Sequence, residues 1–333
     1  MDGPGFLIKE KIEACIDRGL RFLLEEQEAD GSWDSHPGIT ALAASAFLRG
    51  QTNCTDLKWK SSVSRALDYI ASLSRPDGGI YKDDLASLNT AVCILALSQS
   101  NSPKFRSIIE KAQNFLVQLQ CDESAGYSRD DKLYGGIRYG SDRNPDLDNL
   151  DYTLQALKSS GFSENHDIWE KAICFIQRCQ NRNRSNDQTW SADDGGFIYY
   201  PGFSMAGGTR SYGSMTSAGI SCFLNAKIKA DDPRVADAFK WLCGHYSLEE
   251  NPCVGQKGLF HYYYTLSRAL SRCGENIIKD SHGTEHNWQE ELANKLSVLQ
   301  HKDGYWLNEC PEWWEGNKVL VTSYAILSLS YLY

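Results

Sequence analysis

The sequence predicts an all-α protein in which six helical hairpins close into an (α/α)6 toroid. The first observation behind this prediction is that amphipathic helical segments alternate with segments that are apolar on every side, and a helix of the second kind has to be buried on every side. The second observation is repetition, because the pair recurs about six times at intervals of roughly 45 to 70 residues, as stacked helical units do. A closed array of such pairs has an inner ring of buried helices and an outer ring of amphipathic helices.

The first hairpin shows the unit most plainly. Residues Ile8 to Glu26 carry apolar side chains at helical spacing, and Asp30-Gly31 then predicts the end of a helix followed by a turn. A second helix is expected from about Thr40 to Leu48, where nearly every residue is Ala, Leu, Ser or Phe. Each unit should therefore consist of an outer helix, a turn and an inner helix.

The predicted outer helices repeat a common pattern. Four of them carry a cationic residue and a small residue, then an aromatic and an aliphatic residue, and three of these four end in Gln. The four copies are Arg18-Gly19-x-x-Phe22-Leu23-x-x-x-Gln27, Arg65-Ala66-x-x-Tyr69-Ile70-x-x-x-Ser74, Lys111-Ala112-x-x-Phe115-Leu116-x-x-x-Gln120 and Lys171-Ala172-x-x-Phe175-Ile176-x-x-x-Gln180. The fifth copy, Asp237-Ala238-x-x-Trp241-Leu242, lacks the Gln, and the sixth keeps Gln300 without the Phe.

A glycine, followed after one residue by a hydrophobic side chain, comes after most outer helices. The pairs are Gly31 with Trp33, Gly78 with Ile80, Gly195 with Phe197, Gly258 with Phe260 and Gly304 with Trp306. The third unit is irregular, at Gly126-Tyr127. The buried helices begin near Thr40, Thr90, Asp151, Thr216, Thr265 and Thr322. We expect one toroid domain over residues 8–333, preceded by a short tail of residues 1–7.

Composition and charge exclude several classes of protein. With 333 residues, 41% of them hydrophobic and 23% charged, the chain can bury a sizeable core. A net charge of −9 argues against a general nucleic-acid binder, which needs clustered Lys and Arg to neutralise phosphates. Met1 to Ala14 has no apolar signal core, and Val319 to Tyr333 is too short and too rich in Ser to span a bilayer. The expected location is the cytoplasm.

The cysteines do not indicate a disulfide framework. The 11 Cys residues are scattered, mostly inside helical patterns, and never form a Cys-x-x-Cys pair. Buried free thiols are the expected state. We predict neither a metal ion nor any other cofactor.

Two stretches carry a resemblance to a known family. Gln27-x-x-x-Gly31-x-Trp33 and Gln300-x-x-x-Gly304-x-Trp306 resemble the QW repeat of squalene and oxidosqualene cyclases. The degenerate copies between them extend the resemblance from about Ile8 to Tyr333. It implies the α/α toroid that these cyclases share with the β subunits of protein prenyltransferases. The cyclases use two toroids with the cavity between them, whereas this chain has residues for one.

A second resemblance concerns an acidic motif that catalyses the reaction in the family's class II cyclases. Pro145-Asp146-Leu147-Asp148-Asn149 is similar to the Asp-x-Asp-Asp motif of the family's class II cyclases, and an apolar helical run follows it here too. This likeness implies that Asp148 is the proton-donating acid of a protonation-initiated terpene cyclase that acts on an isoprenoid. Asp146 would be its acidic partner, and Asn149 a changed third position. The alternative is that these residues only cap a helix, which is worth about 1 kcal/mol.

A helix N-terminus by itself favours an ionised carboxylate, so burial and the neighbouring carboxylate would have to raise the pKa of an acid at this position.

All the glycine turns lead from an outer to an inner helix and therefore lie at one end of the toroid. The long loops 126–149, 181–214 and 308–318 are expected at the same end, where binding sites are usually built.

Aromatic residues are plentiful in these loops and beside them. Ring faces can stabilise a carbocation by about 0.5 to 2 kcal/mol each, although filling gaps between helices is an alternative use. The predicted substrate contacts are Tyr199, Tyr200, Phe203, Tyr212, Tyr262, Tyr264, Trp313 and Trp314. We expect the segment 181–214 to fold over the mouth and exclude water.

Other functions remain open. Asn149 and the missing second toroid fit a non-catalytic isoprenoid-binding toroid, and a partner subunit or a membrane surface could cover the mouth. A prenyltransferase-like subunit would need a zinc site made by Asp, Cys and His, but residues 215–220 contain no Asp-x-Cys, so His261 is expected to be packed or solvated. A carbohydrate-active toroid would need two carboxyl groups across a cleft, whereas Asp193 and Asp194 are expected to be turn residues.

Overall fold

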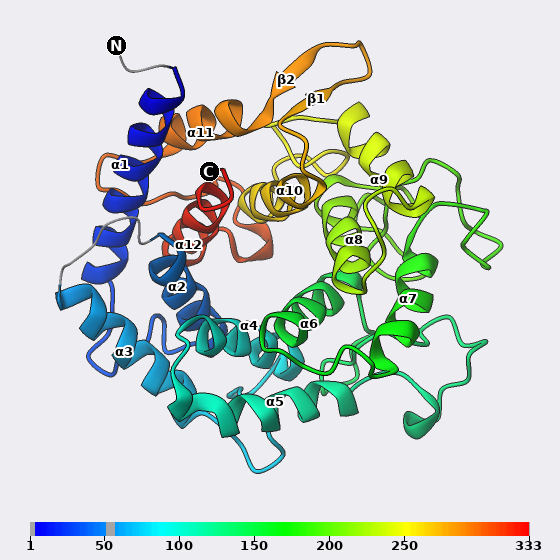
Figure 1. Cartoon of the computed structure of the whole chain (residues 1–333), viewed down its shortest axis with the longest axis horizontal. Coiled ribbons are helices and arrows are strands. Elements are labelled where there is room, and N and C mark those ends of the chain that lie inside the picture. Colours follow the sequence, from blue (N-terminus) through cyan, green and yellow to red (C-terminus); the bar gives the residue numbers. More distant parts are fainter. Residues whose placement is uncertain (1–3, 51–56, 333) are drawn as a thin grey trace.

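The computed structural model describes residues 4–50 and 57–332, which form an all-α fold of two concentric helical rings (Figure 1). The outer helices are α1 (Pro4–Glu25), α3 (Leu57–Ser72), α5 (Arg106–Gln118), α7 (Ile168–Cys179), α9 (Pro233–Gly244) and α11 (Trp288–Leu299). The inner helices are α2 (Pro37–Gly50), α4 (Ala86–Gln99), α6 (Leu147–Ser159), α8 (Gly213–Asn225), α10 (Leu259–Cys273) and α12 (Lys318–Leu329). The predicted (α/α)6 toroid is confirmed.

The inner ring is closed. Each inner helix packs against the next, α12 packs back against α2, and α1 contacts α11. The inner helices α2, α4, α8 and α12 are apolar or small on nearly every side, as in α4, where every residue from Ala91 to Leu97 is buried. The outer helices bury one face only, which in α1 carries Ile16, Leu20 and Leu23 at helical spacing.

A glutamine at the end of four outer helices joins neighbouring units, and we call this arrangement the glutamine clamp. The buried Gln180 donates from Nε2 to the carbonyl oxygen of Gly195 in the following turn (2.9 Å) and to that of Arg234 in the next outer helix (2.8 Å). The same two hydrogen bonds run from Gln27 to Gly31 and Ser62, from Gln120 to Gly135 and Ile168, and from Gln300 to Gly304 and Cys15. The last clamp reaches α1 and therefore fastens the ring shut.

The turn that receives the clamp requires glycine. Gly195 has a φ of 87°, and a Cβ atom there would lie 2.7 Å from the backbone oxygen of Asp237 in the next outer helix. A side chain at this position would push the two units apart. Two residues later, the backbone N–H of Phe197 donates to Oγ1 of Thr216 in α8 (3.1 Å). One turn thus joins two outer helices and an inner helix.

Two of the predicted turns are wrong. The third turn is built on Gly135, which receives the clamp of Gln120, and not on Gly126-Tyr127, because a longer loop precedes the turn in this unit. In the fifth unit, Gly258 is the N-cap residue of α10 and Phe260 lies within that helix, so this glycine does not form a turn of the clamp type.

Helix α1 is longer than the sequence predicts. It begins at Pro4, where proline is well tolerated, so residues 4–7 of the expected tail are helical. Although α1 has 22 residues, neither it nor any other described helix is apolar enough over the length needed to cross a membrane.

Of the cysteines that the sequence predicts to be buried free thiols, Cys54 lies outside the described residues.

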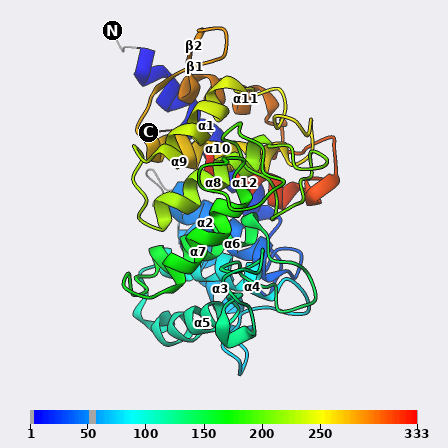
Figure 2. The ribbon, with the colours of Figure 1, turned by 90° about the vertical axis from the view of Figure 1, so that its right-hand side faces the viewer.

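The long connections gather at one end of the toroid. Seen from the side, the α7–α8 loop and the α11–α12 connection project in the same direction (Figure 2). Short 3-10 helices, η2 (Glu123–Ala125) and η3 (Glu312–Trp314), lie in connections from outer to inner helices. The returns from inner to outer helices carry η1 (Pro103–Phe105) and an antiparallel hairpin of β1 (Ile277–Lys279) and β2 (Glu285–Asn287).

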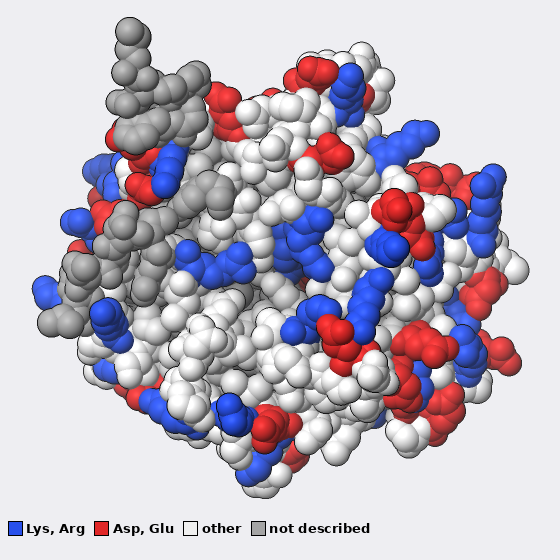
Figure 3. Space-filling view, in the orientation of Figure 1, with Lys and Arg blue, Asp and Glu red and all other residues white. Residues whose placement is uncertain are grey.

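The opposite end of the toroid carries basic side chains at the ends of inner helices. Arg49, Lys158 and Arg272 lie in the last turns of α2, α6 and α10, where a positive charge interacts favourably with the helix dipole. Figure 3 shows Lys and Arg side chains around the centre of this face.

We expect Gln180→Leu to lower the free energy of unfolding by about 2 to 4 kcal/mol, because two carbonyl oxygens lose the amide that bonds them. Gln118→Leu, on the exposed face of α5, is the control and should change stability by about 0.5 kcal/mol or less. Urea denaturation followed by circular dichroism measures both. Equal effects of the two substitutions would contradict a role of the clamp in stability.

Candidate active site

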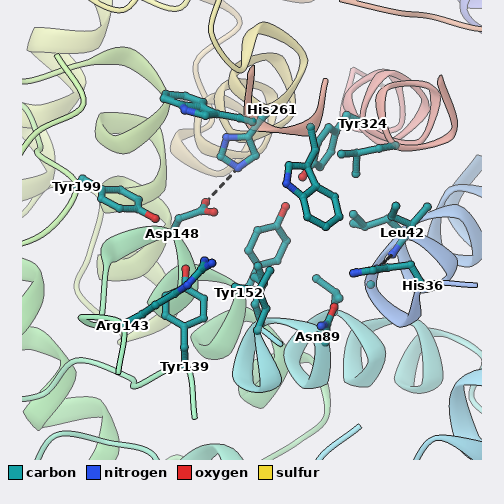
Figure 4. A pocket seen from close by; sticks show the side chains of 18 of the residues that line it. His36, Leu42, Asn89, Tyr139, Arg143, Asp148, Tyr152, Tyr199, His261 and Tyr324 are labelled. Carbon is teal, nitrogen blue, oxygen red and sulfur yellow. Dashed lines mark hydrogen bonds and ion pairs between the residues drawn. The ribbon is translucent and has the colours of Figure 1, made fainter. Parts of the chain in front are cut away.

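A cavity of about 310 Å³ opens at the end of the toroid where the inner helices begin (Figure 4). All six inner helices and five of the connections from outer to inner helices contribute to its wall. Its apolar and aromatic lining residues are Ile39, Leu42, Leu85, Leu88, Val92, Tyr139, Tyr152, Tyr199, Met205, Tyr212, Met215, Trp313, Trp314, Leu320 and Tyr324. Polar side chains gather on two opposite sides, Asp148 with His261 on one and His36 with Asn89 on the other.

Among the described residues, Asp148 supplies the one carboxyl group of the cavity wall. It lies in the first turn of α6, and its Oδ1 atom is 3.1 Å from Nε2 of His261 in the first turn of α10. Both atoms are buried, and neither has a hydrogen-bond partner elsewhere in the described residues. The side chain of Asp148 is still 22% exposed. The pair thus holds one carboxyl oxygen against an imidazole and leaves the other accessible from the cavity.

The buried carboxylate of Glu315 fixes the start of α10. It accepts hydrogen bonds from the backbone N–H groups of His261 (2.7 Å) and Phe260 (3.2 Å), and from Nδ2 of Asn308 (2.6 Å). Burial of His261 opposes its protonation, but the neighbouring Asp148 and Glu315 outweigh burial, and the pKa of His261 is raised. The imidazole therefore contacts the carboxyl group of Asp148 in surroundings that favour a positive charge.

Asp146 is the N-cap residue of α6. Its Oδ1 accepts the backbone N–H of Asn149 (2.9 Å), and its Oδ2 accepts the hydroxyl of Tyr139 (2.8 Å), while the hydroxyl of Tyr199 also hydrogen-bonds to this carboxyl group. Burial, together with the charge of Asp148, raises the pKa of Asp146 to about 7, although the hydrogen bonds favour ionisation. Asp146 therefore takes up a proton near neutral pH. It lies behind the cavity wall and not on it.

The side chain of Asn149 holds α6 against its neighbours through hydrogen bonds. Its side chain is fully buried, with Oδ1 accepting from Oγ of Ser87 (2.9 Å) and Nδ2 donating to the carbonyl oxygen of Ile137 (2.8 Å). These bonds join α6 to α4 and to the loop before α6. All three residues of the motif, Asp146, Asp148 and Asn149, lie together at the start of α6. Of these three, only Asp148 lies on the cavity wall.

Four of the eight predicted substrate contacts lie on the cavity wall, namely Tyr199, Tyr212, Trp313 and Trp314. Tyr199 and Tyr212 come from the segment 181–214. The carbonyl oxygen of Tyr199 accepts the backbone N–H of Leu147 (2.8 Å), so this segment is fastened to the first residue of α6. The segment therefore covers part of the mouth beside the acidic corner, where the sequence predicts it.

Tyr200 and Phe203, from the same segment, do not line the cavity. They flank a tight turn and stack on each other, with ring centroids 4.9 Å apart. Phe203 is 39% exposed. The local turn pairs these rings with each other, whereas Met205, two residues later, reaches the cavity wall.

Tyr262 and Tyr264 also lie off the cavity wall. Tyr262 points about 100° away from His261 around the helix axis, whereas Tyr264 lies about one turn after His261, and both of these rings contact Tyr324. Tyr262 packs against Gly213 at the start of α8, and Tyr264 stacks on Tyr324 with centroids 5.8 Å apart. Both rings fill the space between inner helices, which is the alternative use of an aromatic side chain.

Sequence reasoning missed several residues of the cavity. Tyr152 lies one turn after Asp148 on α6, and this spacing alone could have placed it on the same face. His36, Asn89 and Tyr324 come from other hairpins and have no local pattern that marks them.

The sequence predicts that His261 is either packed or solvated, and in the structure it is packed. The sequence does not predict its pairing with Asp148. Within residues 4–50 and 57–332, no group of three or more His, Cys, Asp or Glu side chains is arranged to hold a metal ion.

A buried ion pair lies farther along the inner ring. Arg268 of α10 hydrogen-bonds to Asp151 of α6, and both side chains are almost wholly inaccessible. Nη1 of Arg268 also donates to Oε1 of Gln155 (2.6 Å). Because α8 stands between α6 and α10 in the ring, these contacts tie together two helices that are not neighbours. This third acidic residue of α6 therefore has a structural partner.

Comparisons with known proteins identify the fold. No protein-family model matches the sequence, and no curated protein does. Among solved structures, a variant of the type II terpene cyclase MstE from Scytonema, in complex with geranylgeranyl dihydroxybenzoate, matches with a TM-score of 0.61 and 12% identity over 98% of this chain and 99% of that one. A protein from Actinoplanes matches with a TM-score of 0.57 and 15% identity, over 96% and 99%. A possible member of the GH105 family from Salmonella enterica has a TM-score of 0.61 and 10% identity, over 99% and 96%. At these identities the likeness concerns the helical toroid.

We expect Asp146→Asn to stabilise the protein at pH 8. The raised pKa means that the folded state binds more protons than the unfolded state between about pH 4 and pH 7, so the wild type loses stability as pH rises through this window. Asn can still cap the helix, and the gain should be on the order of 3 kcal/mol at pH 8 and should vanish near pH 4.

Asp232→Asn is the matched control, because Asp232 caps α9 in the same way but its pKa is lowered by Arg234. This substitution should destabilise the protein at pH 8, and its effect should shrink as the pH falls below about 4. Thermal unfolding of the three proteins across this pH range measures both effects. The same pH dependence for the two variants would refute the assignment of a raised pKa to Asp146.

Proposed function

We propose that the protein is a class II terpene cyclase-like enzyme, in which Asp148 protonates an alkene or an epoxide of an isoprenoid. The observation that carries the proposal is the Asp148–His261 pair, which holds one carboxyl oxygen 3.1 Å from an imidazole at the edge of an apolar, aromatic cavity. The likeness of the fold to a type II terpene cyclase supports it. The proposal treats residues 8–333 as one toroid domain.

Protonation of an alkene is demanding, and His261 is placed to assist Asp148 in it. A protonated imidazole stabilises the carboxylate that forms when Asp148 releases its proton. Burial disfavours that charge on His261, whereas the nearby charge of Glu315 favours it. The proton leaves from the accessible carboxyl oxygen and bonds to a substrate carbon or epoxide oxygen. This step leaves a carbocation in the cavity and a carboxylate beside an imidazolium.

Asp146 and Asn149 act on the acid indirectly. A neutral Asp146 adds no negative charge that would hold the proton on Asp148, and burial, the larger cause of the raised pKa of Asp146, favours this neutral form. Asn149 fixes the start of α6 through Ser87 and Ile137. Both are therefore positioning residues in this proposal, and Asp148 is the catalytic residue.

The rest of the cavity suits the cation that follows. Tyr152, Tyr212 and Trp313 offer aromatic rings on the wall, and each suitably placed ring contributes about 0.5 to 2 kcal/mol. The segment 181–214 limits the access of water to the acidic corner. Carbon–carbon bonds then form as the cation is attacked by further alkenes. The reaction ends when the cation loses a proton or adds water, and Asp148 regains its proton from solvent.

A non-catalytic isoprenoid-binding toroid is the second candidate, because Asn149 replaces the third Asp of the motif. The carbohydrate-active alternative is not favoured, since it needs two carboxyl groups across a cleft and Asp148 is alone on the wall of the described cavity. A prenyltransferase-like subunit is not favoured either, because His261 faces a carboxyl group of α6 instead of an Asp and a Cys on α8.

Asp148→Asn should lower product formation by at least about 100-fold, because it removes the proton but keeps the shape of the side chain. The assay incubates purified protein with isoprenoids of sesquiterpene to triterpene length and analyses the products by gas chromatography and mass spectrometry. Asp142→Asn, in the exposed loop before α6, is the control and should leave the rate unchanged. Binding of isoprenoids without conversion by the wild type would favour the non-catalytic toroid.

The rate should also fall as pH rises through about 7, because ionised Asp146 places a negative charge near Asp148 and disfavours the carboxylate that proton transfer leaves there. In Asp146→Asn this decline should be absent or displaced. The measurement is a pH–rate profile of both proteins between pH 5 and pH 9. Superimposable profiles would exclude Asp146 from the control of acid strength.

A further inference from the structure

The cavity wall opposite Asp148 carries two polar side chains that the proposed proton transfer does not use, Asn89 and His36 (Figure 4). Asn89 is only 4% exposed. Its Nδ2 donates to the carbonyl oxygen of Asp84 (2.9 Å), whereas its Oδ1 makes no hydrogen bond with any described residue. A buried amide oxygen is therefore left as a free acceptor on the cavity wall.

His36 supplies the complementary group. Its Nδ1 accepts the backbone N–H of Ile39 (3.2 Å) at the start of α2, so in the neutral ring the hydrogen resides on Nε2. Burial lowers the pKa of His36, which keeps the ring neutral. Nε2 has no partner among the described residues, and the ring points into the cavity. His36 thus offers a donor on the same side as the acceptor of Asn89.

Gly38 allows these two groups to share one wall. A Cβ atom at this position would lie 2.5 Å from Oδ1 of Asn89 and 3.3 Å from Cε1 of His36. Trp314 packs edge-on against the His36 ring, with centroids 5.5 Å apart, and closes the outer side. Donor and acceptor therefore face the same small space, which glycine keeps open.

The cavity is poor in positive charge. Arg143 is the one Arg or Lys of its wall, and its guanidinium pairs with the carboxylate of Asp84 (3.3 Å). The other cationic group, His261, is occupied by Asp148. Phosphate groups are usually bound by several Arg or Lys side chains or by free backbone N–H groups. The wall of this cavity therefore does not suit a diphosphate.

From this arrangement we infer that the protein selects an isoprenoid that carries an uncharged hydroxyl group at the end remote from Asp148. The hydroxyl donates to Oδ1 of Asn89 and accepts from Nε2–H of His36, while the alkene end lies at Asp148. This inference rests on the proposed function for the isoprenoid nature of the ligand. The volume of about 310 Å³ lies at the lower end of the range of ligand pockets and favours a shorter chain, of sesquiterpene length.

The test measures binding in the Asp148→Asn protein, so that no ligand is converted. The probes are farnesol, the hydrocarbon with the same skeleton but without the hydroxyl group, and farnesyl diphosphate. Quenching of tryptophan fluorescence reports binding, because Trp313 and Trp314 line the cavity. Farnesol should bind roughly 5- to 50-fold more tightly than the hydrocarbon, since it gains two hydrogen bonds, and more tightly than the diphosphate.

Asn89→Leu and His36→Phe, made in the same background, should each abolish most of this preference. Asn225→Leu is the control for the first, because Asn225 is a buried asparagine of the inner ring that does not line the cavity. His166→Phe is the control for the second, because Nδ1 of His166 also accepts a backbone N–H, that of Ile168 (3.1 Å), outside the cavity. Circular dichroism checks that each variant is folded.

Equal binding of farnesol and the hydrocarbon would overturn the inference and leave the proposed function standing. A preference that survives both substitutions, or tighter binding of the diphosphate, would also overturn it. No binding of any probe would overturn both. A preference for farnesol that depends on Asn89 and His36, in a protein whose wild type forms no product, would support the inference and refute the proposed catalysis.

Discussion

The toroid depends on hydrogen bonds that a glutamine amide makes to two carbonyl oxygens at once. Packing one hairpin against the next brings a turn carbonyl and a carbonyl of the next outer helix close together, and leaving such groups unpaired costs about 1 to 3 kcal/mol each. Gln180 bonds to both, and Gly195 leaves room for the close approach. The bond from Gln300 to Cys15 closes the circle. Because the clamped turns all lead from an outer to an inner helix, the inner helices begin at one end, and the cavity forms there.

Two electrostatic effects oppose each other at the N-terminus of a helix. Helix N-termini favour ionised carboxylates, while burial disfavours them. Asp146 and Asp232 are both N-cap residues that accept a backbone N–H, yet the pKa of Asp232 is lowered and that of Asp146 is raised. Asp232 pairs with Arg234, whereas Asp146 is buried beside another carboxyl group. Capping a helix and holding a proton are therefore not alternatives here, because Asp146 caps α6 and has a pKa near 7.

The structure also changes how Asn149 should be interpreted. By resemblance it occupies the third acidic position of the motif, and restoring Asp there would be a natural way to separate a weakened enzyme from a binder. Its Nδ2, however, donates to the carbonyl oxygen of Ile137, and the side chain has no access to the cavity. A carboxylate in its place would face a carbonyl oxygen in a buried site, which is unfavourable. Loss of stability would then obscure any gain in activity.

The sequence by itself determined the helical hairpins, their closure into a toroid, and the position of Asp146 and Asp148 at the start of an inner helix. These features follow from local periodicity and capping, which are written in neighbouring residues. It did not determine that His261 lies against Asp148, that Asn89 and His36 share the opposite wall, or that Tyr262 and Tyr264 point away. Which face of each inner helix turns towards the cavity depends on how six helices pack around one axis. Only the tertiary structure decides this, because residues distant in the chain meet there and burial then sets their pKa values.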